Sequence, residues 1–525
     1  MGRLARKPVA PLLGVCAAAL ALRCVLVLSG VVAFDSDEAV VGLMARHILH
    51  GARPAFFYGQ AYMGSLDAWL VAGAFALLGS SVVAIRIVQS ALFVAHVALT
   101  YVLARRWSGD ETVALLSALL MALPPVLLTL YTTVSLGGYG ETLLLGDLLL
   151  LVGWKLASER QASAGWWALW GLLAGLGFWT LGLVVVTLLP LAALLLQRHR
   201  ARAWRGYLVA VAAFALGSAP WWVYNARHAW QGLRTLYDPT GASDPMAPIL
   251  PLRLRVLGLA LIGLPGLVGL RLPWSAEWLS VLCVPPVVAF HSMAAWRALR
   301  AARQRAWKGG YRLLWGIAAC FGAVSVLSRF GSDPTGRYLL VLYTPLALFA
   351  AAVLAALGGR TRWGAAALAG LLLAFHLWGT WKGATSAEGL TAQYNPQFQY
   401  GNRHDGELIA FLEENGGTRG YTNYWIAFKI AFLSDERVIL ASTLPHKPNM
   451  RLTGEHNRYP PYTDRVAEAE EVVYVTGNQP ELDAVLREGF TARAIAYREW
   501  AIGPYRVFYD LSVPMEPAEL DARWQ

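Results

Sequence analysis

Three carboxylates stand together in Asp35-Ser36-Asp37-Glu38, directly after the first long apolar segment, residues 9–33. Acidic side chains are costly at the mouth of a membrane helix unless they face water or a ligand. Asp37 and Asp35 are therefore candidate general bases, since a carboxylate within hydrogen-bond reach can accept the proton of an attacking hydroxyl. Glu38 would orient the acceptor or share a proton. Helix capping is the structural alternative, but one cap needs one side chain and three acids are present.

Residues 56–67 follow in the same predicted outer loop and interleave aromatic residues with glycine. Tyr58 and Tyr62 suit a surface that contacts sugar or lipid, although an interfacial aromatic belt has the same composition. Asp67, at the start of a short apolar helix, is a second candidate acid. Glu141 follows Gly137-Gly138-Tyr139-Gly140 at the end of another apolar run, where ligand contact and the helix dipole explain an acid equally well.

Two further span ends carry polar side chains on the same predicted side. Asn225 and His228 follow a pair of tryptophans and are candidates for contact with phosphate or sugar, while membrane anchoring explains the tryptophans. Arg337 and Tyr338 lie in a short outer loop, where an arginine runs against the usual cytoplasmic excess of positive charge. A guanidinium can bind phosphate bidentately, so we expect Arg337 to hold a lipid phosphate; snorkelling to the headgroups is the alternative.

Composition places these residues in a membrane protein. Of 525 residues, 57% are hydrophobic and 15% charged, with a mean hydropathy of +0.45, whereas soluble domains are about one quarter charged. Repeated apolar runs of about 17–25 residues predict a polytopic α-helical fold. The net charge of +11 sits in short basic blocks between apolar runs, so no nucleic-acid partner is expected. The four cysteines lie in apolar segments without metal-ligand spacing.

The basic blocks predict the topology. They lie at residues 3–7, 105–106, 155–160, 198–205, 297–312 and 360–362. If all are cytoplasmic, an even number of crossings separates neighbouring blocks. This condition gives about eleven spans, with the N-terminus cytoplasmic and the C-terminus outside. The first apolar run could be mistaken for a signal peptide, but it is long, and we expect it to stay as the first span.

The requirement for an even number of crossings also decides which ambiguous apolar stretches cross the membrane. The amphipathic pattern of residues 40–50 predicts a helix that lies in the membrane interface. Residues 66–78 are too short to span, so we expect a re-entrant or interfacial helix there, and both helices lie within an outer loop, residues 33–82. Residues 164–197 must hold two short helices in close contact through glycines. Residues 250–270, broken by prolines and arginines, are predicted to form an outer-face helix packed on the bundle.

The composition changes after residue 384. We expect residues 1–384 to form the transmembrane module and residues 385–525 to form a soluble α/β domain on the outer face. A helix is expected at residues 406–415, and β-branched runs predict strands at 437–442, 471–476 and 506–511. About 140 residues suffice to bury a separate core.

At these motifs the chain resembles the GT-C superfamily of membrane glycosyltransferases. It is most similar to the bacterial branch related to protein O-mannosyltransferases and lipid A aminoarabinose transferases. The resemblance depends on Asp37-Glu38 after the first span, Glu141 as the later outer-loop acid, and Arg337-Tyr338 before a late span. The Pro-Pro-Leu usual in the family is replaced by Tyr62-Met63-Gly64-Ser65-Leu66, and the later acid is Glu rather than Asp; these differences bear on substrate identity.

The resemblance implies transfer of a sugar from a polyprenyl-phosphate carrier to an acceptor hydroxyl on the extracytoplasmic face of the bacterial inner membrane, with inversion. Asp37 or Asp35 would be the base, and Arg337 would offset charge on the departing phosphate. The implied partners are the polyprenyl-phosphate sugar donor, an unidentified glycan, lipid or protein acceptor, and membrane lipids. Some members use a divalent cation; no metal-ligand set stands out in this sequence, and no other cofactor is expected.

Two alternatives come from other functional classes. A transporter or flippase for a lipid-linked glycan would also be polytopic, but it would be expected to show internal repeats and mid-membrane ionisable groups; no repeat is evident, and Arg23 is the clearest mid-span charge. A non-catalytic assembly scaffold would not need acids concentrated at span ends.

Overall fold

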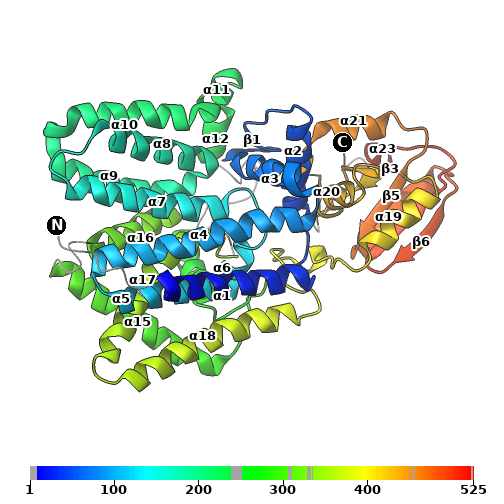
Figure 1. Ribbon diagram of the computed structural model, residues 1–525. Helices are drawn as coiled ribbons and strands as arrows, with labels where there is room; N and C mark the ends of the chain where they lie inside the picture. The colour runs from blue at the N-terminus through cyan, green and yellow to red at the C-terminus, as the bar shows by residue number, and fades with distance from the viewer. Residues whose placement is uncertain are drawn as a thin grey trace.

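The computed structural model describes residues 9–237, 251–304, 310–327, 333, 335–446, 449–452, 456–521 and 524. Within these ranges the chain forms a bundle of long helices and, beside one end of the bundle, a smaller region that contains a β-sheet (Figure 1). The basic residues Arg3, Arg6 and Lys7 of the first predicted cytoplasmic block lie outside the described residues.

Each predicted span contains a helix. These helices are α1 (Val9–Leu28), α4 (Val82–Ser108), α5 (Glu111–Ala122), α7 (Tyr139–Ser158), α8 (Ala164–Thr180), α9 (Val185–His199), α10 (Trp204–Gly217), α15 (Val284–Arg303), α16 (Gly310–Leu327), α17 (Tyr343–Gly358) and α18 (Arg362–Ala384). Among the described residues, seven helical stretches are long and apolar enough to cross a membrane, and one of them, Gly182–Gly217, includes both α9 and α10. The protein is therefore a multi-pass membrane protein, while the number of about eleven crossings stays a prediction.

Glycines set the packing of α8. Helix α8 ends before Leu181, and the 3₁₀ turn Gly182–Val184 then leads into α9. The stretch therefore contains the two short helices expected. The close contact, however, is with α10: a Cβ at Gly171 would lie 2.1 Å from Ala210 O, and one at Gly175 would lie 2.1 Å from Phe214 O. Small residues thus let the backbones of α8 and α10 touch.

The first outer loop contains more structure than its apolar pattern indicates. It holds α2 (Ser36–Leu49), an antiparallel hairpin of β1 (Phe56–Phe57) and β2 (Gln60–Gly64), and α3 (Leu66–Leu78), which has the bounds expected for the interfacial helix. We expected the apolar face of α2 to lie in the membrane interface. In the structure α2 packs against both α3 and α20 (Tyr424–Leu433), so its apolar residues contact protein.

The stretch before α15 contains only short helices among its described residues. They are α11 (Ala219–Arg227), α12 (Gln231–Tyr237), α13 (Leu252–Gly258), a π-helical turn (Leu259–Gly263) and α14 (Leu264–Leu267). Pro265 stands at the start of α14, where a missing N–H costs little. The helical stretch expected at residues 250–270 is present, in segments too short to span separately.

The C-terminal region is built around a mixed five-stranded sheet with the order β4-β3-β5-β7-β6. Its strands are β3 (Arg419–Thr422), β4 (Ile439–Ser442), β5 (Val473–Gly477), β6 (Arg498–Ile502) and β7 (Tyr505–Tyr509), with β3 parallel to β4 and β5. Helices α19 (Asp405–Glu414), α20, α21 (Pro460–Ala467), α22 (Pro480–Ala492) and α23 (Pro517–Leu520) accompany it. The α/β character expected after residue 384 is confirmed; β3 and β6 were missed.

The chain that leaves the last bundle helix returns to the end of the first. Leu390 N donates to Val31 O at 2.8 Å, and Ala33 N donates to Leu390 O at 2.9 Å. Asn402 extends this contact, since its side chain accepts from Phe34 N and donates to Val32 O. The segment immediately before the acidic loop is therefore held by residues some 360 positions later in the chain, as the bridge between Val32 and Leu390 indicates.

Candidate active site

Asp35 caps α2. Its Oδ1 accepts from Glu38 N at 3.0 Å, and its Oδ2 accepts from Gln393 Nε2 at 3.1 Å. Burial, together with the neighbouring charge of Asp37, raises the pKa of Asp35 to about 7. The capping alternative therefore describes Asp35, whose two oxygens both have partners.

Asp37 lies one residue into α2 and keeps part of its surface exposed. Its Oδ1 accepts a hydrogen bond from the hydroxyl of Tyr424, at the start of α20. A carboxylate with one oxygen bound and access from solvent is suited to accept a proton at the other oxygen. The geometry thus favours Asp37 over Asp35 as a base.

Glu38 forms a buried ion pair. Arg86 of α4 donates from Nε to Glu38 Oε1 at 3.1 Å and from Nη2 to Oε2 at 2.8 Å, and it also donates to the carbonyls of Val32 and Ala33. Both side chains are almost fully buried. Breaking such a pair leaves an uncompensated buried charge, so this geometry favours an anchor for the acidic loop and not a proton acceptor.

Asp67 and Glu141 share a second buried network. Gln89 Nε2 donates to Asp67 Oδ1 at 3.0 Å and to Glu141 Oε1 at 3.2 Å, while Asp67 Oδ2 accepts from Ser135 Oγ at 2.6 Å. Asp67 Oδ2 also accepts from the backbone N of Gly137. The network therefore joins α3, α4 and the start of α7 behind the acidic loop.

Arg337 begins a 3₁₀ turn (Arg337–Leu342) after Gly336, whose φ of 81° suits glycine. Its Nε lies 2.9 Å from Asp333 Oδ2, and Nη2 donates to Tyr338 Oη at 3.4 Å. Two more tyrosines surround it: the ring centroid of Tyr139 lies 6.3 Å from Tyr338 and 5.5 Å from Tyr131. About one third of the Arg337 side chain is exposed.

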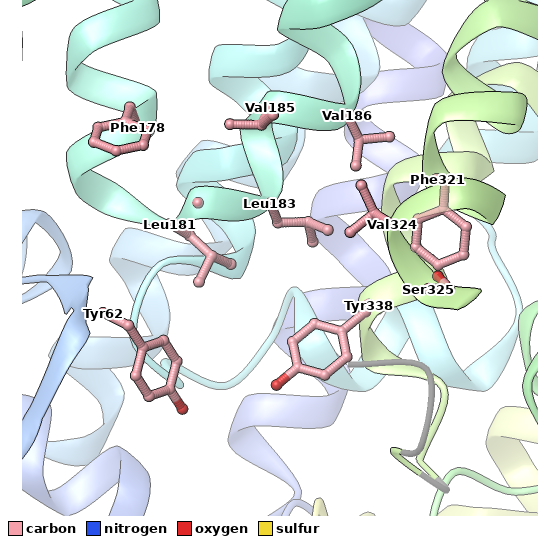
Figure 2. Close-up of a pocket in the computed structure, with 11 residues that line it drawn as sticks. Tyr62, Phe178, Leu181, Leu183, Val185, Val186, Phe321, Val324, Ser325 and Tyr338 are labelled. Carbon is pink, nitrogen blue, oxygen red and sulfur yellow. The ribbon is translucent and has the colours of Figure 1, made fainter. Parts of the chain in front are cut away.

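An apolar cavity of about 240 Å³ ends at Tyr62 and Tyr338. The remaining wall consists mainly of aliphatic and aromatic side chains from the α8–α9 connection and from α16, including Phe178, Leu183 and Val324. Figure 2 shows the hydroxyls of Tyr62 and Tyr338 pointing into the space between the two rings at one end of the cavity.

Tyr62 interacts with both the acidic and the basic residues of the site. Its hydroxyl interacts electrostatically with Tyr338, Arg337, Arg458 and Asp37. Tyr131 similarly interacts with Arg337 and with Asp35. Tyr62, which lines the cavity, is therefore within electrostatic reach of both the candidate base Asp37 and the candidate phosphate-binding Arg337.

Three predicted residues lie apart from this end of the cavity. Tyr58 contacts His47 Nδ1 at 3.0 Å and stacks on Tyr459 of the C-terminal region. Asn225 is buried and bonds to the backbone of Trp221 and Leu233, which is a local structural role. His228 is exposed, stacks on Tyr224, and lines a second groove.

Sequence reasoning missed Tyr424, Gln393 and Arg458, which approach the acidic loop from the C-terminal region. Arg458 Nη1 donates to Gly59 O at 3.3 Å, and its guanidinium lies 5.2 Å from the ring centroid of Tyr424. These residues are more than 350 positions from the loop, and no local pattern indicates such a pairing.

Among the described residues, no three His, Cys, Asp or Glu side chains are grouped as metal ligands. Asp67 and Glu141, the two acids of the buried network, are bridged by the Gln89 amide nitrogen, which donates to both.

Comparison with known proteins confirms the resemblance to the GT-C superfamily of membrane glycosyltransferases. The family model for dolichyl-phosphate-mannose-protein mannosyltransferase matches residues 65–224. An undecaprenyl phosphate-α-4-amino-4-deoxy-L-arabinose arabinosyl transferase of Pseudomonas fluorescens is 31% identical over 162 residues, which cover 29% of this chain and 27% of that relative.

Solved structures agree at the level of the whole fold. The crystal structure of ArnT from Cupriavidus metallidurans bound to undecaprenyl phosphate has a TM-score of 0.60 at 13% identity and covers 97% of this chain and 100% of its own. The oligosaccharyltransferase of Archaeoglobus fulgidus, in complex with zinc and sulfate, has a TM-score of 0.50 at 14% identity. The match covers 95% of this chain and 73% of the oligosaccharyltransferase chain. At these identities the likeness shows the fold alone.

Proposed function

We propose that this protein transfers a sugar from a polyprenyl-phosphate donor to an acceptor hydroxyl, with inversion at the anomeric carbon. The observation that carries the proposal is the apolar cavity that ends at Tyr62 and Tyr338; Arg337 donates to Tyr338, and Asp37 interacts electrostatically with Tyr62. An apolar cavity suits an isoprenoid chain, and a neighbouring cation suits the phosphate that the chain carries. The undecaprenyl phosphate in the ArnT structure supports this donor class.

In the proposed reaction, the acceptor oxygen attacks the anomeric carbon while the bond between that carbon and the lipid-phosphate oxygen breaks. Asp37 accepts the hydroxyl proton through the oxygen that Tyr424 does not occupy. The lipid phosphate leaves with the bonding electrons, and Arg337 stabilises its negative charge. The phosphate would compete with Asp333, which pairs with Arg337 in the structure.

The proposed site lies on the extracytoplasmic side of the bacterial inner membrane. The basic blocks at residues 105–106 and 198–205 lie at the opposite ends of their helices from the acidic loop and support this orientation. We propose that residues 1–384 form the membrane module and that residues 385–525 form the outer domain. The acceptor class, whether glycan, lipid or protein, stays open.

Reconstitution tests the proposal. Wild-type protein in proteoliposomes, supplied with polyprenyl-phospho-sugars and candidate acceptors, should release polyprenyl phosphate and transfer the sugar, whereas Asp37→Asn should reduce the rate by about 100-fold or more. Arg337→Gln should weaken inhibition by added polyprenyl phosphate by about tenfold or more, since a charge-assisted contact is lost. Wild-type rates in a folded Asp37→Asn protein would contradict the proposal.

A further inference from the structure

Helix α20 carries Tyr424 to the acidic loop. Asn423 caps the helix through a hydrogen bond from Trp425 N to its Oδ1, and its own amide donates to Gln479 at 3.0 Å. The helix lies between α2 and the sheet, and its residues are apolar or aromatic except for Lys429, which is buried and pairs with Asp405; Tyr424 is 1% exposed. The hydroxyl that reaches Asp37 is therefore held by a rigid element and not by a loose loop.

Arg458 reaches the same place from the segment before α21. It is 7% exposed, and its guanidinium lies over the ring of Tyr424 and donates to Gly59 O. With its amide oxygen turned toward the guanidinium, Gln60 accepts from Arg458 Nη2 at 2.6 Å. A Cβ at Gly59 would lie 2.8 Å from Arg458 Cδ, so the hairpin turn fits closely around this arginine.

From these contacts we infer that the C-terminal region completes the active site by supplying Tyr424 and Arg458 as positioning residues for Asp37. The inference rests on the proposed function, because it assigns these residues a part in the same reaction. Asp37 and Arg337 both lie within residues 1–384, whereas Tyr424 and Arg458 come from the C-terminal region, so the proposed transferase site is shared between these two parts of the chain.

The two side chains act on Asp37 in different ways. The Tyr424 hydroxyl fixes one carboxylate oxygen, which orients the other toward an incoming acceptor. Arg458 interacts electrostatically with Tyr424 and Asp37, and its guanidinium lies over the Tyr424 ring. A hydrogen bond to an ionised group is stronger than a neutral one, so removing the Tyr424 hydroxyl, or the arginine that packs on its ring, should misplace the base without removing it.

Steady-state kinetics of the reconstituted full-length protein test the inference. Tyr424→Phe should lower kcat by about tenfold or more and leave the KM for the polyprenyl-phospho-sugar within about twofold. Arg458→Met should also lower kcat, and Arg458→Lys should recover part of the loss because it keeps the charge. Tyr462→Phe is the matched control, since it removes a buried hydroxyl at the same interface that bonds to Glu436 and not to Asp37.

Each outcome separates this inference from the proposed function. Equal kcat values for Tyr424→Phe and wild type would overturn the inference and leave the transferase proposal intact. A Tyr462→Phe protein as impaired as Tyr424→Phe would also overturn it, because the loss would then reflect the interface in general. Absence of transfer by the wild-type protein would contradict the proposed function itself.

Discussion

Asp35 and Asp37 stand two residues apart, and their surroundings give them different chemistry. Asp35 has both oxygens bonded, and burial raises its pKa to about 7. Asp37 holds one hydrogen bond, from Tyr424, and its other oxygen has no hydrogen-bond partner among the described residues. The raised pKa of Asp35 favours its protonated form, which limits repulsion between the two acids.

This difference predicts that replacement by asparagine is tolerated at Asp35 and abolishes sugar transfer at Asp37. Asparagine caps a helix about as well as aspartate and imitates a protonated carboxyl, so Asp35→Asn should keep transfer within about fivefold of wild type and shift Tm by less than about 3 °C. Asp37→Asn should fold equally well and lose the reaction. Thermal unfolding and transfer rates should be measured for both variants. A larger loss of transfer in Asp35→Asn than in Asp37→Asn would assign the base to Asp35 instead of Asp37.

At the scale of elements, the contact between α2 and α20 joins the acidic loop to the C-terminal region. Gly42 of α2 faces the ring of Phe432, and a Cβ there would lie 2.5 Å from Phe432 Cε2. Phe432 cannot move freely, because Phe34 and Phe75 pack on its ring and the Arg46 guanidinium lies 4.1 Å from its centroid. The absence of a side chain at Gly42 therefore allows the two helices to approach.

Gly42→Leu should force the helices apart and lower the stability of the folded protein by about 1–3 kcal/mol. Gly73→Leu is the matched control, because a Cβ at Gly73 of α3 would have no atom within 4 Å. Leucine also has a higher helix propensity than glycine. Thermal unfolding should separate the variants, and limited proteolysis should release the C-terminal region of Gly42→Leu first. Equal Tm values and equal proteolysis of the two variants would show that the contact between α2 and α20 accommodates a larger side chain at Gly42.

The same interface should weaken in acid. Burial opposes ionisation of Glu436, but hydrogen bonds from His47 and Tyr462 and the charge of Arg46 lower its pKa from 4.5 to about 2. An acid with a depressed folded pKa stabilises the protein above its ordinary pKa, and that stabilisation is lost as the pH falls toward the folded value. We therefore expect Tm to fall between pH 4.5 and about 2 in part through this group.

Glu436→Gln should lower Tm at pH 7 and show a smaller further loss on acidification than the wild type. Glu413→Gln provides the control, because Glu413 pairs with Arg437 at an exposed site, where ion pairs contribute little. Parallel pH–Tm curves for wild type and Glu436→Gln would contradict the expected contribution.

Local patterns predicted many elements of this fold but not their pairing. Apolar length placed the bundle helices and α3, and β-branched runs placed β4, β5 and β7. Strand β6 was missed because its Arg-Glu-Trp-Ala-Ile sequence is that of an exposed edge, and α20 was missed because a short all-apolar run does not distinguish helix from strand. Asp35, Asp37 and Arg337 were identified from their types and positions, whereas their partners Gln393, Tyr424 and Asp333 depend on tertiary contacts.

For the whole molecule, topology is the main untested expectation. A single cysteine at Asn449, in a background free of the four native cysteines, should react with an impermeant maleimide on intact spheroplasts. A cysteine at Arg202, in the turn between α9 and α10, should react only after permeabilisation, because it lies in a predicted cytoplasmic block. Equal labelling of both positions from outside would overturn the parity argument and the proposed side of the site.

The contact of Leu390 with Val31 and Ala33 has a consequence for biogenesis. The acidic loop emerges from the ribosome early, yet the segment around Leu390 that holds the start of this loop, and the side chains that approach Asp37, are translated only after the last bundle helix. A nascent chain therefore carries its proposed nucleophile-activating acid long before that acid is properly oriented. Sugar transfer by an incompletely translated chain would thus be suppressed until the C-terminal region has been synthesised.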